Sequence, residues 1–187
     1  MRLPPTVKEV KARYLSEHTA THEQRGDIEI VRCFKPGTGV YWIGYWFSKG
    51  TLAVYGDCGN AVYQWHKSIG SLAEVADCNL DYFAEKCQAS PFGRGFKTWN
   101  RDVAEDRLRE FSASMDEPVD PELLREALES LDSEYEWNVF REEHGDEVIG
   151  SDSWEHCDIG MTVDIQCRLH LAGLKKAFEV ILTEVKI

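Results

Sequence analysis

Residues 50–65 constrain the fold of this chain most strongly, because their pattern is typical of two short strands joined by a tight turn. On the two sides of residues 56–60, Leu52 and Val54, then Tyr63 and Trp65, recur at every second position. This period of two, with β-branched and aromatic residues, is typical of strands. The linking residues are Gly, Asp and Asn among others, types that tolerate left-handed backbone angles. The stretch predicts a β-hairpin with Gly59 at positive φ, and with Tyr63 and Trp65 on one face of a sheet.

Two more strands are predicted before this hairpin, over 27–34 and 40–47, with a Pro-Gly turn at 35–39 between them. The second of these is apolar on both alternating faces, so we expect it in the centre of the sheet with both sides covered. The alternative is that the face carrying Trp42 and Trp46 contacts a partner. Short connections throughout indicate an antiparallel meander.

Helical spacing dominates the rest of the chain. An N-terminal helix is predicted over 6–18, followed by a polar loop over 17–26. Capping residues and apolar stripes predict the later helices, which begin near Asn79, Asn100, Asp120, Ser133 and Asp164. The helix from Ser133 is expected to end at Gly145.

The expected fold class is therefore α+β, a four-stranded antiparallel sheet with an N-terminal helix, followed by an acidic helical half. With 187 residues, the chain suits a single domain over 1–187. Its 1–70 part would be mainly β and its 71–187 part mainly α, and the two would share one core.

Negative charge is concentrated in one part of the chain. The formal net charge is −12, yet residues 1–100 hold 12 basic and 10 acidic residues, whereas residues 102–158 hold 20 acidic residues against four arginines. Such a surface repels nucleic acid and membrane phosphates and attracts basic proteins. The simpler alternative is that these carboxylates only keep helical faces solvated.

Carboxylates on rigid helices can approximate the charge spacing of a phosphate backbone, and a groove rich in Arg and Lys would match them. We therefore predict partner binding by the acidic residues of the third long helix and the loop after it. These residues are Glu136, Glu142, Glu143, Asp146, Glu147, Asp152 and Glu155.

The six cysteines contain no C-x-x-C pair, so a zinc ribbon or a thioredoxin-like motif is not predicted. No signal-peptide core or bilayer-spanning run is evident, and we expect free thiols in a cytosolic protein. The pair His18 and His22 and the pair His156 and Cys157 are each too few for a metal site. No metal and no cofactor is expected.

An enzymatic alternative stays open at this stage. Cys58 with His66 would make a thiol–imidazole pair, and the acid-rich cluster Asp152–Asp158 would offer a second site. The Gly- and Arg-containing loop Phe92–Phe96 could hold a phosphate or stack a base, or its aromatic residues could simply plug the core.

Three segments resemble a group of small proteins encoded by bacteriophages and prophages: residues 56–65 (GDCGNAVYQW), 79–90 (NLDYFAEKCQAS) and 170–178 (HLAGLKKAF). The resemblance covers the middle and the end of the chain. It implies a phage-borne accessory protein and assigns no catalytic residues.

Together these features predict a non-enzymatic, phage-encoded interaction protein. It would act in the host cytoplasm against a host nucleic-acid-handling defence system, as anti-CRISPR or anti-restriction proteins do. Its acidic surface would occupy a basic groove, without direct binding to nucleic acid or membrane. The alternatives are a small cytosolic enzyme using Cys58 and His66 or the Asp152–Asp158 cluster, and an accessory protein that forms a homodimer through its aromatic sheet face.

Overall fold

The computed structural model describes residues 4–65, 69–90, 96–150 and 158–184. The chain divides into two compact units. The sheet unit comprises residues 4–96 and 163–187, and the helical unit comprises residues 97–162. The described residues form two separate buried clusters, one in each unit. The larger cluster combines residues of the 1–70 part with helices of the 71–187 part, as expected, whereas the helical unit has a core of its own. The single domain over 1–187 stays a prediction, but the contacts divide the chain near residues 96 and 163 rather than near residue 70.

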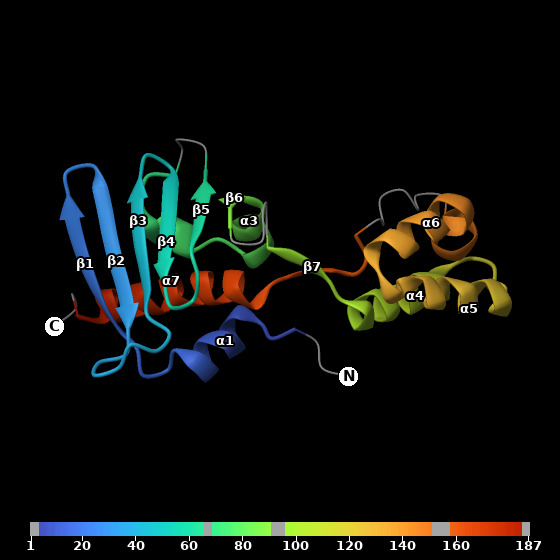
Figure 1. Cartoon of the computed structure of the whole chain (residues 1–187), viewed down its shortest axis with the longest axis horizontal. Helices are drawn as coiled ribbons and strands as arrows, with labels where there is room; N and C mark the ends of the chain where they lie inside the picture. Colours follow the sequence, from blue (N-terminus) through green and yellow to red (C-terminus); the bar gives the residue numbers. More distant parts are fainter. Residues whose placement is uncertain (1–3, 66–68, 91–95, 151–157, 185–187) are drawn as a thin grey trace. The chain divides into compact units, whose positions relative to one another are not determined.

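The sheet unit contains an antiparallel sheet whose strands follow one another in sequence order (Figure 1). Its described strands are β1 (Thr19–Arg25), β2 (Ile28–Phe34), β3 (Ile43–Ser48), β4 (Thr51–Gly56), β5 (Ala61–Gln64) and β6 (Cys87–Ala89). The class is α+β, but the predicted four-stranded sheet is wrong, because the sheet has six strands and a second sheet pairs two more, β7 and β8.

The two strands that the sequence did not predict lie at the edges of the sheet. In β1 only Ala20 is buried, so this strand shows no alternating pattern and its polar sequence is typical of a loop. Backbone pairing with β2 along all seven of its residues holds it in place. Strand β6 has three residues directly after a helix, which is too short for any periodicity to appear.

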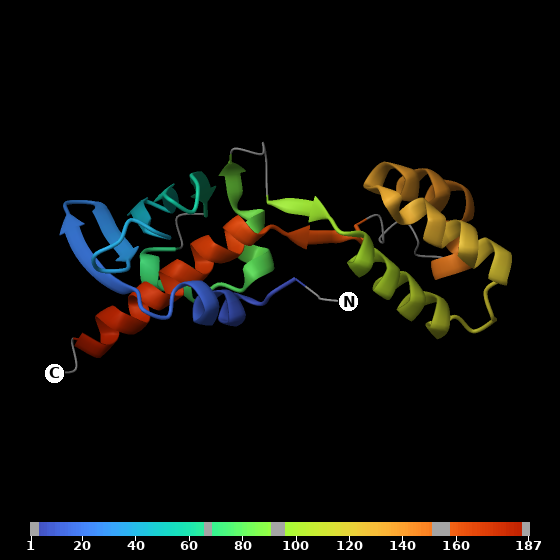
Figure 2. The ribbon, with the colours of Figure 1, turned by 60° about the horizontal axis from the view of Figure 1, so that its bottom comes forward.

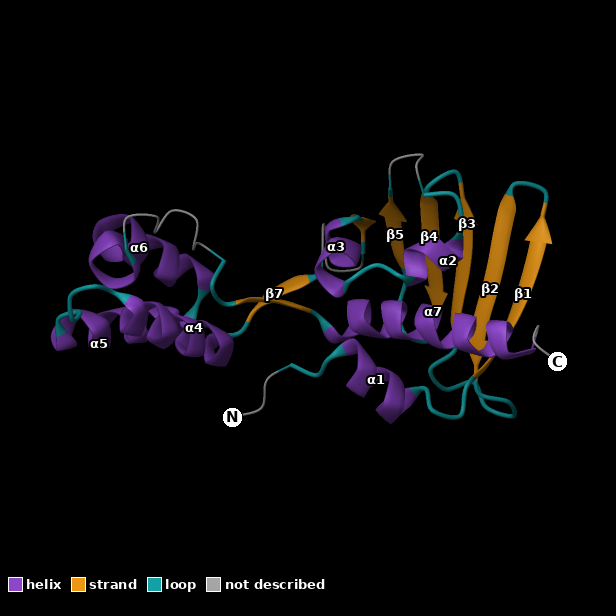
Figure 3. Cartoon of the chain, turned by 180° about the vertical axis from the view of Figure 1, so that it is seen from behind, coloured by secondary structure: helices purple, strands orange, loops and turns teal. Residues whose placement is uncertain are grey.

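The helices of the described sheet unit gather on one face of the sheet (Figure 3). They are α1 (Val7–Tyr14), α2 (Leu72–Ala76), α3 (Leu80–Glu85) and α7 (Ile165–Glu184). Thr6 starts α1 with a reciprocal capping box to Glu9. Helix α1 lies alongside α7 (Figure 2). At Gly173, α7 approaches the sheet so closely that a Cβ atom would lie 2.4 Å from Tyr45 Oη.

The central hairpin forms as predicted between β4 and β5. Gly59 has φ +93°, and Tyr63 and Trp65 are both buried in the core of the sheet unit. A Cβ atom at Gly59 would also lie 2.9 Å from Oε1 of Gln166. The turn therefore needs glycine for its backbone conformation and for the close approach of α7.

We expect Gly59→Val to lower the free energy of unfolding by about 1–3 kcal/mol, because valine is strained at positive φ. Urea denaturation at neutral pH measures this change. Gly39→Val is the matched control, since Gly39 lacks a positive φ and its Cβ position meets nothing within 4 Å. It should shift stability by less than about 0.5 kcal/mol. Equal losses in the two variants would contradict the assigned role of Gly59.

The helical unit consists mainly of three helices, each of which begins directly after a capping residue. Its elements are β7 (Lys97–Trp99), α4 (Arg101–Ser114), α5 (Pro121–Glu129), the 3₁₀ turn η1 (Ser130–Asp132) and α6 (Glu134–Ile149), followed by β8 (Met161–Val163), which pairs with β7. The side chains of Asn100, Asp120 and Ser133 cap the three long helices. Trp137 is fully buried at the centre of this unit.

The predicted end of α6 at Gly145 is wrong. Gly145 is buried within the helix, which continues to Ile149 and ends at Gly150 with φ +96°. Val148 and Ile149 are buried as well, so they extend the apolar stripe that begins at Trp137. The stripe continues past the glycine, and its burial outweighs the weak helix propensity of one residue.

Strand β3 is central, but only one of its sides is covered. Ile43, Tyr45 and Phe47 are buried beneath the helices, whereas the Trp46 side chain on the other face is 50% exposed. The prediction of a strand covered on both sides is therefore wrong, because no described helix lies on the second face. None of the helices in the described ranges has the length and apolar character required to cross a bilayer.

Candidate functional site

The helical unit carries most of the negative charge of the chain. Residues 97–162 hold 20 acidic and six basic residues. Because α4, α5 and α6 turn their apolar stripes toward Trp137 and its neighbours, their carboxylates lie on the outside. The expected inward packing of the apolar stripes is therefore confirmed, while binding at the acidic outside stays a prediction.

Arginines offset part of this charge, mainly on α4, α5 and η1. Arg125 bridges Glu122 and Glu129, Arg109 pairs with Glu105, and Arg101 pairs with Asp132. Glu142 and Glu143 on α6 are exposed and make no ion pair within the described part of the chain. The C-terminal half of α6 is therefore the strongest candidate for a negatively charged contact surface.

The seven predicted partner-binding residues have different surroundings. Glu136 bonds the capping residue Ser133, both by its backbone and by its carboxylate, so it has a local structural role. Glu147 pairs with His144 at 3.2 Å. Glu142, Glu143 and Asp146 are exposed on α6. The remaining two, Asp152 and Glu155, lie outside the described residues.

Sequence reasoning missed two apolar residues on the same exposed face. The Tyr135 side chain is 77% exposed and that of Val139 is 44% exposed. Their spacing to Glu142, Glu143 and Asp146 places all five on one side of α6. We call these five residues the acidic ridge. The signal in the sequence was that Tyr135 and Val139 fall outside the apolar stripe that contains Trp137.

The thiols of the sheet unit are poorly suited to nucleophilic chemistry. Burial raises the pKa of Cys33, Cys58 and Cys167 to about 12, so these groups stay protonated at neutral pH. Cys58 is only 5% exposed, and its proposed partner His66 lies outside the described residues. All five described cysteines are free; the state of all six in solution stays a prediction.

The other candidate sites receive little support from the described residues. His22 lies on strand β1 and contacts Glu29, so His18 and His22 do not share a helix face. No group of three potential metal ligands occurs in the described ranges. Of the Asp152–Asp158 cluster and the Phe92–Phe96 loop, only Asp158 and the buried Phe96 are described. Asp158 lies 4.0 Å from the Lys97 ammonium group.

A buried polar cluster links α7 to the hairpin. His170 is fully buried, and its Nε2 lies 3.1 Å from the carbonyl oxygen of Cys58. A carbonyl can only accept, so Nε2 carries the proton and Nδ1 accepts from Tyr63 Oη at 2.8 Å. Burial lowers the pKa of His170 to about 4. The cluster is enclosed within the core, so we assign it to stability.

We expect the stability of the protein to fall as the pH drops from about 6.5 toward 4. The folded protein holds His170 neutral, whereas the unfolded chain takes up a proton at the ordinary pKa of 6.5. The lowered pKa corresponds to a loss of about 3 kcal/mol across this range. Urea titrations between pH 4 and 7.5 should show a flatter profile for His170→Gln than for the native chain. Parallel profiles would contradict the prediction.

Comparisons of the chain with protein-family models, with curated proteins and with solved structures found no match. A function for the chain must therefore be inferred from its sequence and from the geometry described above.

Proposed function

We propose that this chain is a phage-encoded interaction protein that antagonises a host nucleic-acid-handling defence system of the anti-CRISPR or anti-restriction type. The acidic ridge on α6 would dock in a basic groove that otherwise holds nucleic acid. The observation that carries the proposal is the segregation of charge, with 20 acidic and six basic residues in the helical unit. The phage origin rests on the resemblance of residues 56–65, 79–90 and 170–178 alone.

The composition of the acidic ridge fits a protein partner better than a solvated surface. Carboxylates steer a basic partner and raise the association rate. Exposed aromatic residues supply contact energy, and tyrosine is among the residue types enriched at binding hot spots. Tyr135 lies on the same side of α6, about two turns before Glu142, and is 77% exposed, so one helix face combines both contributions.

The test is competition. The full chain is immobilised and exposed to purified nucleic-acid-guided or nucleic-acid-cleaving complexes, at several sodium chloride concentrations from low to moderate. The proposal expects a complex that weakens steeply with salt and that is displaced by the nucleic acid of the target. A partner that binds with its nucleic acid still in place, or with no dependence on salt, would overturn the proposal.

A further inference from the structure

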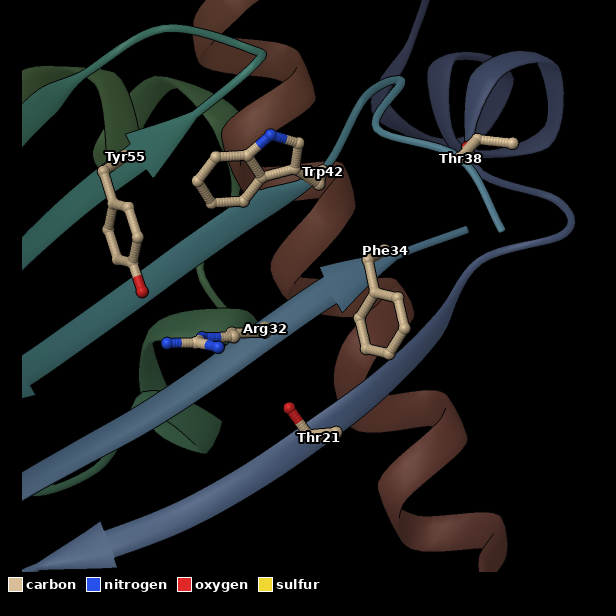
Figure 4. A pocket seen from close by; sticks show the side chains of 6 residues that line it. All are labelled: Thr21, Arg32, Phe34, Thr38, Trp42 and Tyr55. Atoms are coloured by element: carbon tan, nitrogen blue, oxygen red, sulfur yellow. The ribbon is translucent and has the colours of Figure 1, made fainter. Parts of the chain in front are cut away.

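The face of the sheet opposite the helices contains a pocket of about 480 Å³. Figure 4 shows its lining, which comes from β1, β2, β4 and the segment that connects β2 to β3. The lining residues are Thr21, Arg32, Phe34, Thr38, Trp42 and Tyr55. The volume lies in the usual range of small-molecule sites. All of these residues belong to the sheet unit, so the pocket is separate from the acidic ridge.

Strand register aligns the polar groups of this pocket in one row. Thr21 is paired with Arg32, Arg32 with Gly44, and Gly44 with Tyr55. Since directly paired residues point to the same side of a sheet, their side chains share the open face. The row therefore consists of the hydroxyl of Thr21, the guanidinium group of Arg32, the bare backbone of Gly44 and the phenol ring of Tyr55.

The tyrosine fills the gap above Gly44. A Cβ atom at Gly44 would lie 2.2 Å from Cζ of Tyr55, so the ring lies directly against the backbone of β3. Trp42 and Trp46 flank this ring, with centroids at 5.6 and 5.1 Å. Tyr55 Oη is shielded from solvent and has no hydrogen-bond partner among the described residues. The hydroxyl is therefore enclosed by this packing, and the ring of Tyr55 forms part of the pocket lining.

Arg32 supplies an unpaired positive charge in the same row. Its side chain is exposed, and neither an ion pair nor a hydrogen bond to it occurs within the described residues. The neighbouring carboxylate on β1, Glu23, is bonded to Arg25 at 2.6 Å, and the more distant Arg32 acts on it only through its charge, which also lowers the pKa of Glu23. An exposed guanidinium group can bind the phosphate of a ligand whose planar base stacks on nearby aromatic rings.

We propose that this open-face pocket binds a free nucleotide, with its base on the aromatic wall formed by Trp42 and Phe34 and its phosphate on Arg32. Stacking on aromatic side chains suits any base. The hydroxyl groups of the exposed residues Thr21 and Thr38 supply hydrogen bonds to the base edge or the sugar. A free nucleotide fits better than a long strand, because backbone tracking needs many cations, whereas the pocket lining holds one arginine and the chain has a net charge of −12.

The experiment compares ligands with and without a phosphate group, each measured with and without the Arg32 side chain. Calorimetry measures AMP and adenosine, then GMP, CMP and UMP, with the full native chain and with Arg32→Gln. In the native chain we expect AMP to bind at least about tenfold more tightly than adenosine, as a charge-assisted contact to phosphate implies. In Arg32→Gln this ratio should fall to about one, while adenosine binds as before. Arg13→Gln, which removes an exposed arginine of α1 that does not line this pocket, should leave the ratio unchanged.

Further measurements test whether an oligonucleotide or a second copy of the chain, rather than a free nucleotide, binds at this face of the sheet. Trp42→Leu should weaken AMP and adenosine equally, because it removes the stacking surface alone. The proposal is overturned by equal affinities for AMP and adenosine, by a ratio that survives in Arg32→Gln, or by the absence of binding at millimolar nucleotide. It is also overturned if only oligonucleotides bind, or if sedimentation shows a dimer that Trp46→Glu dissociates and that excludes AMP.

Discussion

Reversing Glu142, Glu143, Asp146 and Glu147 together to lysine is expected to abolish binding of the basic partner. These residues lie in the last turns of α6 and are exposed. The loss should appear mainly in the association rate and in its dependence on salt, as for other steering charges. Each single reversal should cost only about 0–1 kcal/mol of binding free energy, because exposed pairs are weak. Surface plasmon resonance at several salt concentrations measures both quantities.

The quadruple variant should remain folded, which separates binding from stability. Lysines near the C-terminus of a helix interact favourably with its dipole, so α6 should be at least as stable as before. A matched control reverses four exposed carboxylates of the sheet unit, Asp27, Asp77, Glu85 and Glu179. It changes the net charge equally and should retain most of the binding. Equal losses would show that net charge alone matters, and the acidic ridge would then have no special role.

Trp137→Ala is expected to lower the stability of the helical unit by about 3–5 kcal/mol, the usual range for truncating a large buried aromatic residue. Trp137 is fully buried among Leu108, Leu131 and Val148, and alanine would leave a cavity there. Hydrogen exchange with mass spectrometry should show α4, α5 and α6 losing protection. Strands β2 to β5 should keep theirs, because they belong to a separate buried cluster.

Tyr135→Ala is the control for this experiment. Tyr135 lies on the same helix and is 77% exposed, so its truncation should change stability by less than about 0.5 kcal/mol. If Trp137→Ala instead removes protection from both units together, the chain unfolds as one cooperative domain, as its length and composition predict.

The helices and strands that could be predicted are those whose own residues show the periodicity, turn or capping pattern of that element. The β4–β5 hairpin has alternating strands and a glycine turn, and α5 has Asp120 before Pro121 at its start. Strand β1 could not be predicted, because it is held by pairing with β2 and buries only Ala20. The prediction that α6 ends at Gly145 was wrong because Val148 and Ile149, which follow this glycine, are buried by tertiary packing that local sequence does not reveal.

The two candidate sites, the acidic surface and the open-face pocket, also differ in how far the sequence predicts them. Charge can be counted along the chain, so the amino-acid sequence alone reveals the acidic half. It does not reveal the open-face pocket, because Thr21, Arg32 and Tyr55 come from three strands and only the register brings them into one row. The exposure of Trp46 likewise depends on every described helix of the sheet unit packing on the other face.

The pairing of β7 with β8 has a consequence for how such a chain can change. The backbone amide of Asn100 donates to the carbonyl oxygen of Gly160 at 2.8 Å, so the two ends of the intervening segment are neighbours. A two-residue turn of the Asn-Gly type would close the same ladder as a plain hairpin. The segment between Asn100 and Gly160 is therefore inserted between two paired strands, and we expect that its replacement by such a turn would leave the β7–β8 ladder intact.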